Sequence, residues 1–209
     1  KTIGFGPTMG ALHAGHMSLV DRSVNENDIT VTSIFINPTQ FNVTDDYSEY
    51  PRLFGEDLAQ LEKAGVDIVF CPSEKELYPD GYRYRIKENS LSDQLEGAFR
   101  PGHFDGVLTI VMKLLIVVAP NRAYFGEKDW QQYLLVRDMA VAFLLSTEIV
   151  PCPLVRDSDG LALSSRNSLL SDDERTIAPQ FHKILASESL LKDKWDTLTK
   201  SKFEVEYME

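Results

Sequence analysis

Residues 1–16 read KTIGFGPTMGALHAGH, and their pattern predicts the first structural unit of the chain. Residues 2–6 are typical of a short strand, and a turn rich in proline and glycine follows them. The next apolar residues have helical spacing; they are Leu12, Met17, Leu19, Val20 and Val24. The opening unit is therefore predicted to be a strand, a glycine turn and a helix.

The same alternation continues along the chain. Apolar patterns predict strands over residues 30–37, 66–70, 122–125 and 148–155, an exposed edge strand over 82–87, and helices over 53–64, 107–118 and 131–145. Gly65 stands where a helix C-terminal cap belongs, and Pro151 and Pro153 place the 148–155 strand at a sheet edge or break it. We therefore predict an α/β fold with a Rossmann-like, doubly wound and mostly parallel sheet.

The last part of the chain has a different pattern. Residues 171–174 (SDDE) are typical of a capping box that opens a last helix, and residues 203–208 (FEVEYM) alternate as a strand would. We expect a domain boundary between Asn167 and Ser171.

The composition narrows the class of protein. The 209 residues include 21 Lys and Arg against 32 Asp and Glu, a formal charge of −11, which argues against binding to nucleic acid phosphates. Uncharged apolar runs such as residues 114–120 are far shorter than the roughly 20 residues that span a bilayer, and no secretory segment opens the chain. Cys71 and Cys152 could form one disulfide, but we expect two reduced core thiols in a cytoplasmic protein.

The first turn carries the strongest chemical signal. Ligands of doubly wound folds bind at the carboxyl ends of strands, near helix N-termini. Gly10 and Gly15 would let the backbone approach a phosphate, and His13 and His16 can face one ligand. The helix dipole favours neutral imidazoles, which still donate hydrogen bonds. The alternatives are a glycine turn with two surface histidines, or a metal pair that lacks a third ligand nearby.

Two later segments could bind the same anion. Residues 126–129 (GEKD) follow a predicted strand, and residues 161–167 (LALSSRN) offer two hydroxyls and a guanidinium, which suit a triphosphate. A charged turn and a helix-capping loop are the simpler interpretations. The three segments, together with Arg156 shortly before the third, gather five cations or imidazoles in an acidic chain: His13, His16, Lys128, Arg156 and Arg166. This gathering predicts an anionic ligand.

Two further loops carry polar or charged side chains. Residues 37–41 (NPTQF) end the second predicted strand, where side-chain amides could bind a small polar substrate; an ordinary turn is the alternative. Residues 96–104 (EGAFRPGHF) bring an arginine and a histidine into one loop, or form a structural loop held by Pro101.

These motifs occur in an order that is similar to one family. HAGH resembles the HxGH motif of nucleotidylyltransferases and class I aminoacyl-tRNA synthetases. The full set is PTMGALHAGH, IFINPTQF, YPR, LEGAFRPGHF, FGEKDWQQ and DGLALSSRN. Over residues 2–167 this set closely resembles the pantothenate synthetase (pantoate–β-alanine ligase) family.

The resemblance implies an activity and its requirements. The family condenses pantoate with β-alanine, using ATP and Mg²⁺ and releasing AMP and diphosphate through a pantoyl-adenylate intermediate. The resemblance also implies a nucleotide-binding catalytic domain over residues 1–168, part of a small C-terminal α+β lid domain over 169–209, a homodimer, a cytoplasmic location, and no nucleic acid or membrane partner.

The resemblance further implies roles for single residues. The catalytic residues would be His16, His13, Lys128 and Arg166. The ATP-binding residues would be Met9, Gly10, Ala11, Leu12, His13, Ala14, Gly15, His16, Gly126, Glu127, Lys128, Asp129, Val155, Leu163, Ser164, Ser165 and Arg166. Gln40, Gln132 and Asn37 would bind pantoate, and Gln40 would also bind β-alanine. Mg²⁺ would be held mainly by ATP oxygens and water, with Asp57 as a further candidate contact.

The sequence departs from the family pattern in three respects. Gly6 stands where the family has a branched apolar residue, which predicts a less well packed strand. The resemblance implies a helical segment before the first strand that this sequence does not include, and the residues after Asn167 are too few for a complete lid. Two other functions stay open: another HxGH-type nucleotidylyltransferase, which leaves a nucleotide on its product, and a non-catalytic ATP-binding module.

Overall fold

A computed structural model describes residues 1–42 and 44–208 of the protein. The chain divides into two compact units, Lys1–Leu154 and Val155–Glu209. The second unit begins upstream of residue 168. The functional domain boundary expected near that residue stays a prediction.

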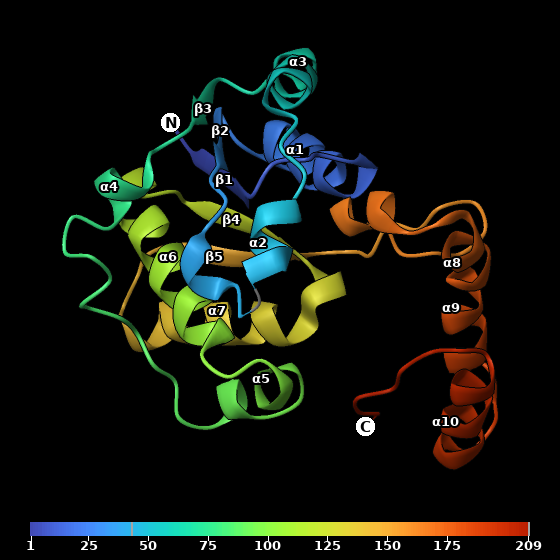
Figure 1. The fold of residues 1–209 in the computed structure, drawn as a ribbon. Helices are drawn as coiled ribbons and strands as arrows, with labels where there is room; N and C mark the ends of the chain where they lie inside the picture. Colours follow the sequence, from blue (N-terminus) through green and yellow to red (C-terminus); the bar gives the residue numbers. More distant parts are fainter. Residues whose placement is uncertain (43, 209) are drawn as a thin grey trace. The chain divides into compact units, whose positions relative to one another are not determined.

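A five-stranded sheet forms the centre of the first unit (Figure 1). Its order is β3-β2-β1-β4-β5, and every neighbouring pair is parallel. The strands are β1 (Ile3–Thr8), β2 (Ile29–Ile34), β3 (Ile68–Phe70), β4 (Arg122–Gly126) and β5 (Glu148–Cys152). The predicted doubly wound α/β sheet is confirmed, and all of its strands are parallel.

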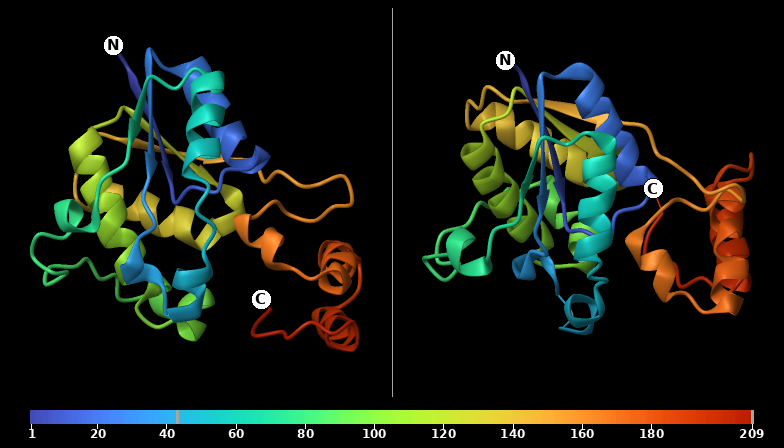
Figure 2. Two further views of the ribbon diagram at one scale, coloured as in Figure 1. Left: turned by 45° about the horizontal axis from the view of Figure 1, so that its top comes forward. Right: turned by 90° about the horizontal axis from the view of Figure 1, so that it is seen from above.

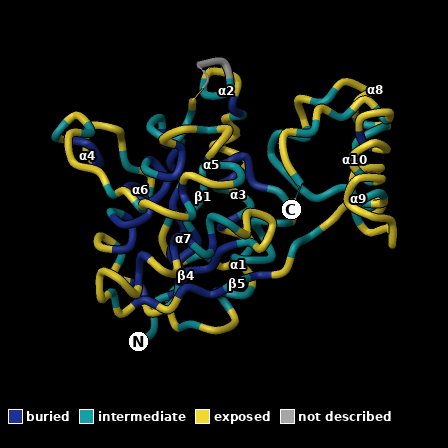
Figure 3. The backbone as a smooth tube through the Cα atoms, turned by 90° about the horizontal axis from the view of Figure 1, so that it is seen from below, coloured by how far each residue is buried: buried dark blue, intermediate teal, exposed yellow. Residues whose placement is uncertain are grey.

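Helices cover both faces of this sheet (Figure 2). Helices α1 (Ala14–Glu26) and α3 (Phe54–Ala64) pack on one face, and α6 (His103–Val118) and α7 (Trp130–Ala142) pack on the other. The strand register aligns Val31, Phe5, Ala123 and Ile149 in one row, and this row is buried against α6 and α7. The buried segments of Figure 3 follow this arrangement, since the central strands and α6 are its most continuously buried parts. Because both faces of the sheet are covered, successive residues of a strand are buried, and this burial explains the apolar runs from which the strands were predicted.

Shorter elements complete the two units. The first unit also contains η1 (Pro38–Gln40), α2 (Thr44–Glu49), α4 (Glu74–Leu77), η2 (Leu91–Asp93), α5 (Glu96–Phe99) and η3 (Glu127–Asp129). The second contains η4 (Ser165–Leu169), α8 (Asp172–Ile177), α9 (Pro179–Leu185) and α10 (Leu191–Lys200). No helix in the described part of the chain is long and apolar enough to cross a membrane.

Several local predictions are confirmed. Gly65 ends α3 with a left-handed φ of 84°, and Ser171 opens α8 through a capping box with Glu174. Strand β5 is an edge strand that pairs with β4 alone, which leaves Pro151 without a ladder bond to lose. Helix α7 stops at Ala142 rather than at residue 145 because Leu144 adopts a φ of 57°.

Two predicted strands and one burial prediction are wrong. Residues 82–87 form an irregular segment, because the Ile86 N–H donates to Thr109 Oγ1 on α6, at 2.9 Å, instead of to a strand. Residues 203–208 form no strand either; the Phe203 ring packs on Phe181, and their alternation has no partner strand among the described residues. Both cysteines are free, as expected, but Cys71 is exposed and only Cys152 lies in the core.

Candidate functional site

The turn from β1 to α1 lies at the carboxyl end of the central strand. Gly10 and Ala11 both have left-handed backbones, with φ values of 81° and 49°. A Cβ atom on Gly10 would lie 2.9 Å from Asp57 Oδ2, so only glycine fits there. The Asp57 carboxylate, from the first turn of α3, accepts the N–H groups of Ala11 at 2.9 Å and Leu12 at 2.7 Å. Asp57 therefore holds this turn in place.

Two imidazoles cap the start of α1. The Nδ1 atom of His13 accepts the Gly15 N–H at 3.1 Å, and the Nδ1 atom of His16 accepts the His13 N–H at 3.3 Å. The ring centroids are 4.0 Å apart. Because each neutral ring uses Nδ1 as an acceptor, its proton lies on Nε2. The pair thus presents two Nε2–H donors at a helix N-terminus, where an anion is favoured.

The electrostatics of the site keep both rings neutral. Burial is the main cause that lowers the pKa of His16 to about 4; His13 and Lys128 contribute to this lowering, and Asp129 opposes it. Burial also lowers the pKa of His13, and Lys128 adds to that effect. The predicted neutral imidazoles are in agreement with these shifts.

The end of β4 supplies a cation near the histidine pair. Lys128 and Asp129 lie in η3, directly after Gly126, and both act electrostatically on His16. The Lys128 ammonium contacts Asp129 Oδ1 at 3.1 Å, and both side chains are exposed. Glu127 is exposed between them and the strand. A phosphate approaching the histidines would therefore meet an accessible ammonium group.

The Gln40 side chain is held in one orientation. Its Oε1 atom accepts from Asn37 Nδ2 at 3.0 Å, and its Nε2 atom donates to the Met9 sulfur at 3.4 Å. An amide nitrogen carries two hydrogens and a thioether is a weak acceptor. Gln40 therefore offers an N–H donor, suited to a carboxylate or hydroxyl, beside the β1–α1 turn.

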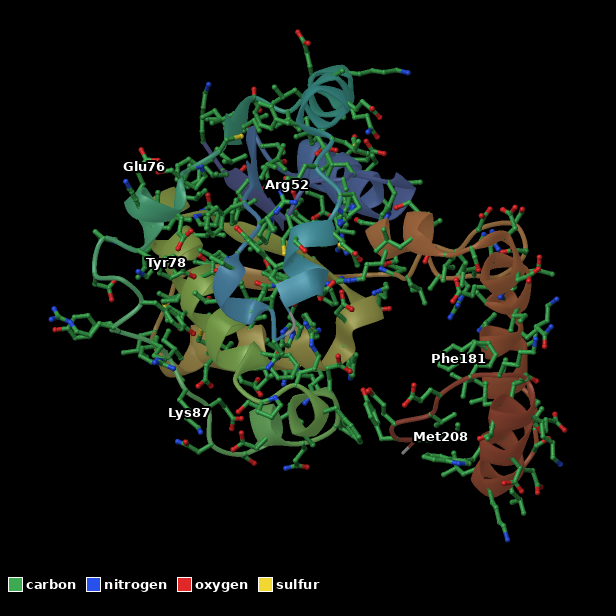
Figure 4. The ribbon with its side chains drawn as sticks, viewed as in Figure 1. Arg52, Glu76, Tyr78, Lys87, Phe181 and Met208 are labelled. Atoms are coloured by element: carbon green, nitrogen blue, oxygen red, sulfur yellow. The ribbon has the colours of Figure 1, made fainter. Side chains whose placement is uncertain are left out.

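Asn37 is buried beneath Gln40. Its Oδ1 atom accepts from the hydroxyl groups of Tyr78 at 2.7 Å and Thr39 at 3.0 Å. Burial raises the pKa of Tyr78 to about 12, so this hydroxyl stays protonated and donates. Tyr78 lies just after α4 (Figure 4). These contacts indicate that Asn37 supports Gln40, while its contact with pantoate stays a prediction.

The loop before α6 holds the main chain of Gln40. His103 Nδ1 lies 2.7 Å from the Gln40 carbonyl oxygen, and since that oxygen can only accept, Nδ1 carries the proton. Arg100 donates to the same oxygen at 3.4 Å. The sequence singled out both residues without a role. Gln132 lies in the first turn of α7, and its side chain has no hydrogen-bond partner among residues 1–42 and 44–208.

The remaining predicted ATP residues lie in the second unit. Leu163 N–H donates to the Val155 carbonyl at 3.1 Å, which closes a hairpin around residues 157–160. Arg175 forms ion pairs with Asp157 and Asp159 of that hairpin, at 2.9 and 2.5 Å. The Ser164 hydroxyl then caps η4 by accepting the Arg166 N–H at 3.3 Å, so the hairpin leads directly into Ser164, Ser165 and Arg166.

The structure thus brings together two groups of the predicted residues. In the first unit, Met9 of the turn accepts a hydrogen bond from Gln40, and Lys128 and Asp129 act electrostatically on His16 of the same turn. In the second unit, the Val155 carbonyl accepts a hydrogen bond from the Leu163 N–H. Sequence reasoning missed Tyr78, whose contact with Asn37 spans 41 residues.

The parallel sheet, with a donor-rich turn at the end of its central strand, defines an α/β protein of the Rossmann-like class. The comparisons with known proteins then specify which one. A family model described as pantoate-beta-alanine ligase matches residues 1–209, so the chain belongs to that family.

Its relatives and structural neighbours are in agreement. The chain is 50% identical over 208 residues to the pantothenate synthetase of Coxiella burnetii, covering 100% of this chain and 80% of that protein. A crystal structure of pantoate-beta-alanine ligase from Francisella tularensis, complexed with beta-gamma ATP and beta-alanine, superposes with a TM-score of 0.96 at 43% identity, covering 100% and 81% of the two chains. Pantothenate synthetase from Thermus thermophilus superposes with a TM-score of 0.89 at 44% identity, covering 96% and 76%.

Proposed function

We propose that this chain joins pantoate to β-alanine with ATP, through a pantoyl-adenylate intermediate, and releases AMP and diphosphate. Family membership and the relatives support the ligase activity, and the Francisella protein is complexed with beta-gamma ATP and beta-alanine. One observation in the structure carries the proposal: two neutral imidazoles present Nε2–H donors at the N-terminus of α1, with Lys128 nearby.

The reaction has two displacement steps. In the first, a pantoate carboxylate oxygen attacks the α-phosphorus of ATP, and diphosphate leaves with the electrons of the broken P–O bond. In the second, the β-alanine nitrogen attacks the acyl carbon, AMP leaves, and the nitrogen loses a proton as the amide forms. Both steps need charge stabilisation and orientation rather than a protein nucleophile.

The geometry supports a role for each group of side chains. His16, His13 and Lys128 would donate to the phosphate oxygens as charge develops on the leaving diphosphate. The glycines and backbone of residues 9–16, together with residues 126–129, would form the ATP site, and Val155, Leu163, Ser164, Ser165 and Arg166 would complete it. Gln40 and Gln132 would bind pantoate, with Asn37 behind Gln40, and Gln40 would also meet β-alanine.

Mg²⁺ would arrive with ATP. Among the described residues, no three His, Cys, Asp or Glu side chains form a group that could bind a metal ion. The family resemblance implies an ion held mainly by phosphate oxygens and water. The family resemblance further supports a cytoplasmic homodimer that acts on small molecules, without a nucleic acid or membrane partner.

Diphosphate release tests the proposal. ATP is supplied with pantoate alone and then with β-alanine added. Slow or single-turnover release with pantoate, rising to steady turnover with β-alanine, is the expected result. A stable adenylylated product without an amide would favour a nucleotidylyltransferase. Binding of ATP with no release under either condition would leave only a nucleotide-binding module.

A further inference from the structure

Asp57 is a buried carboxylate at the site for which the reaction provides no role. It is 1% exposed, and no other Asp or Glu whose burial the structure describes is buried. Burying a carboxylate is costly unless hydrogen bonds replace its hydration. Two do so here, from the consecutive N–H groups of Ala11 and Leu12. These hydrogen bonds therefore stabilise both the buried carboxylate and the backbone conformation of the turn.

That backbone shape is unfavourable by itself. Gly10 and Ala11 are left-handed in succession, and Ala11 has a Cβ atom that disfavours this conformation. Such a turn aims successive N–H groups at one point, which makes it an anion-binding nest. In nucleotide-binding proteins a nest of this kind can hold a phosphate. Here Asp57 fills it, so the nest is not available to a ligand.

The filled nest sits directly before the histidine pair. Leu12, whose N–H Asp57 accepts, precedes His13, the N-cap of α1. A shift of the turn would therefore move both Nε2–H donors and the helix N-terminus. We infer that Asp57 is a positioning residue, an internal anion that fixes the β1–α1 turn so that the nucleotide phosphates meet α1 and the histidines. This inference rests on the proposed function.

The same geometry argues against Asp57 as a direct magnesium ligand. Each of its oxygens already accepts one backbone N–H, and its exposure of 1% leaves no room for the water molecules that Mg²⁺ usually keeps. The two roles make different predictions. A magnesium ligand affects ATP binding only when the metal is present, whereas a positioning residue affects it with or without metal.

Asp57→Asn separates these roles. Asparagine keeps one acceptor but directs an NH₂ group at the second backbone N–H. Glu56→Gln, on an exposed residue of the same helical turn, is the matched control. Amide hydrogen exchange at Ala11 and Leu12 is measured by NMR, and the Kd for ATP is measured calorimetrically with Mg²⁺ and with EDTA.

We expect slow exchange of both amides in the unsubstituted protein. In Asp57→Asn the exchange should speed up and the Kd for ATP should rise about tenfold or more, by the same factor with Mg²⁺ and with EDTA. Glu56→Gln should change neither. Rapid exchange in the unsubstituted protein, unchanged exchange in the variant, or weakening confined to Mg²⁺ would each overturn the inference.

A second variant addresses folding. If Asp57→Asn is unstable, Ala11→Gly in the same background removes the left-handed penalty at Ala11, and the double variant should recover the fold and part of the ATP affinity. A double variant that binds ATP no better than a folded Asp57→Asn protein, or that also fails to fold, contradicts the inference. Failure of the proposed function appears separately, as no pantoate-dependent diphosphate release from the unsubstituted protein.

Discussion

The backbone N–H of His13 donates to the Nδ1 atom of His16 at 3.3 Å, and the His13 ring in turn accepts the Gly15 N–H. Helix α1 therefore begins with two imidazoles where a capping box ordinarily has a hydroxyl and a carboxylate or amide. In each ring, Nδ1 caps the helix and Nε2–H is a donor to a ligand. Substitutions can separate the capping role from the donor role.

The stability of the protein should fall as the pH falls from 6.5 towards 4. The pKa of His16 is lowered from 6.5 to about 4, so between these values the unfolded chain binds more protons than the folded one. His16 thus contributes stability at neutral pH that is lost on acidification. Between pH 7.5 and pH 5 we expect this single group to remove about 2 kcal/mol from the free energy of unfolding.

Urea unfolding at pH 7.5 and pH 5 measures this loss, with His16→Gln as the non-titrating control. Groups remote from His16 titrate equally in both proteins, so the difference between the two pH dependences reports on His16 and on its neighbour His13. Equal losses of stability in the two proteins would show that His16 is not held neutral by burial.

His16→Gln should also separate capping from catalysis. Glutamine is a normal residue at the third position of a capping box, so its Oε1 atom can accept the His13 N–H and keep α1 intact. Its Nε2 amide group can still donate to a phosphate, although from a flexible side chain rather than from a fixed ring edge. We therefore expect kcat for ATP-dependent ligation to fall by only about tenfold, less than in a variant without any donor, while stability at pH 7.5 changes little.

His16→Ala removes both uses of the ring. It should lose about 10²–10³ in kcat, by analogy with the loss of an oxyanion donor, and in addition about 1 kcal/mol of stability, the usual cost of a lost cap. If His16→Ala lost less than about tenfold in kcat, the proposed donor role would be wrong. Steady-state diphosphate release and urea unfolding supply the two measurements.

The sheet could be predicted because its strands are buried on both faces. The row Val31, Phe5, Ala123 and Ile149 lies against α6 and α7, so burial imposes apolar runs that the sequence displays directly. The alternation of residues 82–87 led to a wrong strand prediction, because an alternating pattern does not show whether a neighbouring strand is available for pairing. The main chain there is satisfied by Asp80 and Thr109 side chains instead.

The candidate site could be predicted only in part. The glycines and histidines of the β1–α1 turn are neighbours in sequence, and their spacing indicates a helix start at a strand end. Asp57, Tyr78 and His103 act through contacts that span 41 to 63 residues. Such contacts follow from tertiary packing, and nothing in local spacing shows which carboxylate or hydroxyl will be buried.

Gly106→Ala should weaken pantoate binding selectively. A Cβ atom on Gly106 would lie 2.5 Å from the Thr39 carbonyl oxygen, so α6 would push η1 and Gln40 away from the site. We expect KM for pantoate to rise about tenfold or more, with KM for ATP nearly unchanged. Gly55→Ala, where a Cβ atom meets nothing within 4 Å, is the control. Equal increases in both KM values would indicate general disruption.

The two glycines of β1 should respond in opposite ways to alanine. A Cβ atom on Gly6 would lie 3.6 Å from Thr32 Oγ1, an ordinary contact, and Gly6 does not adopt a left-handed backbone. Gly6→Ala should therefore stabilise the protein by about 0.5–1 kcal/mol, because alanine restricts the unfolded chain and fills space in the sheet. This expectation agrees with the branched residue that the family resemblance implies at this position.

Gly4 is two residues away on the same strand, so a Cβ atom added to Gly4 would point to the same face of the sheet as one added to Gly6. There a Cβ atom would lie 2.2 Å from Ser23 Oγ and 2.4 Å from Asn27 Nδ2, which hold the C-terminal end of α1. Gly4→Ala should cost about 1–3 kcal/mol through overpacking. Urea unfolding at pH 7.5 measures both variants. A destabilised Gly6→Ala protein would mean that the close approach of α1 to β1 extends over the whole strand, rather than ending at Gly4.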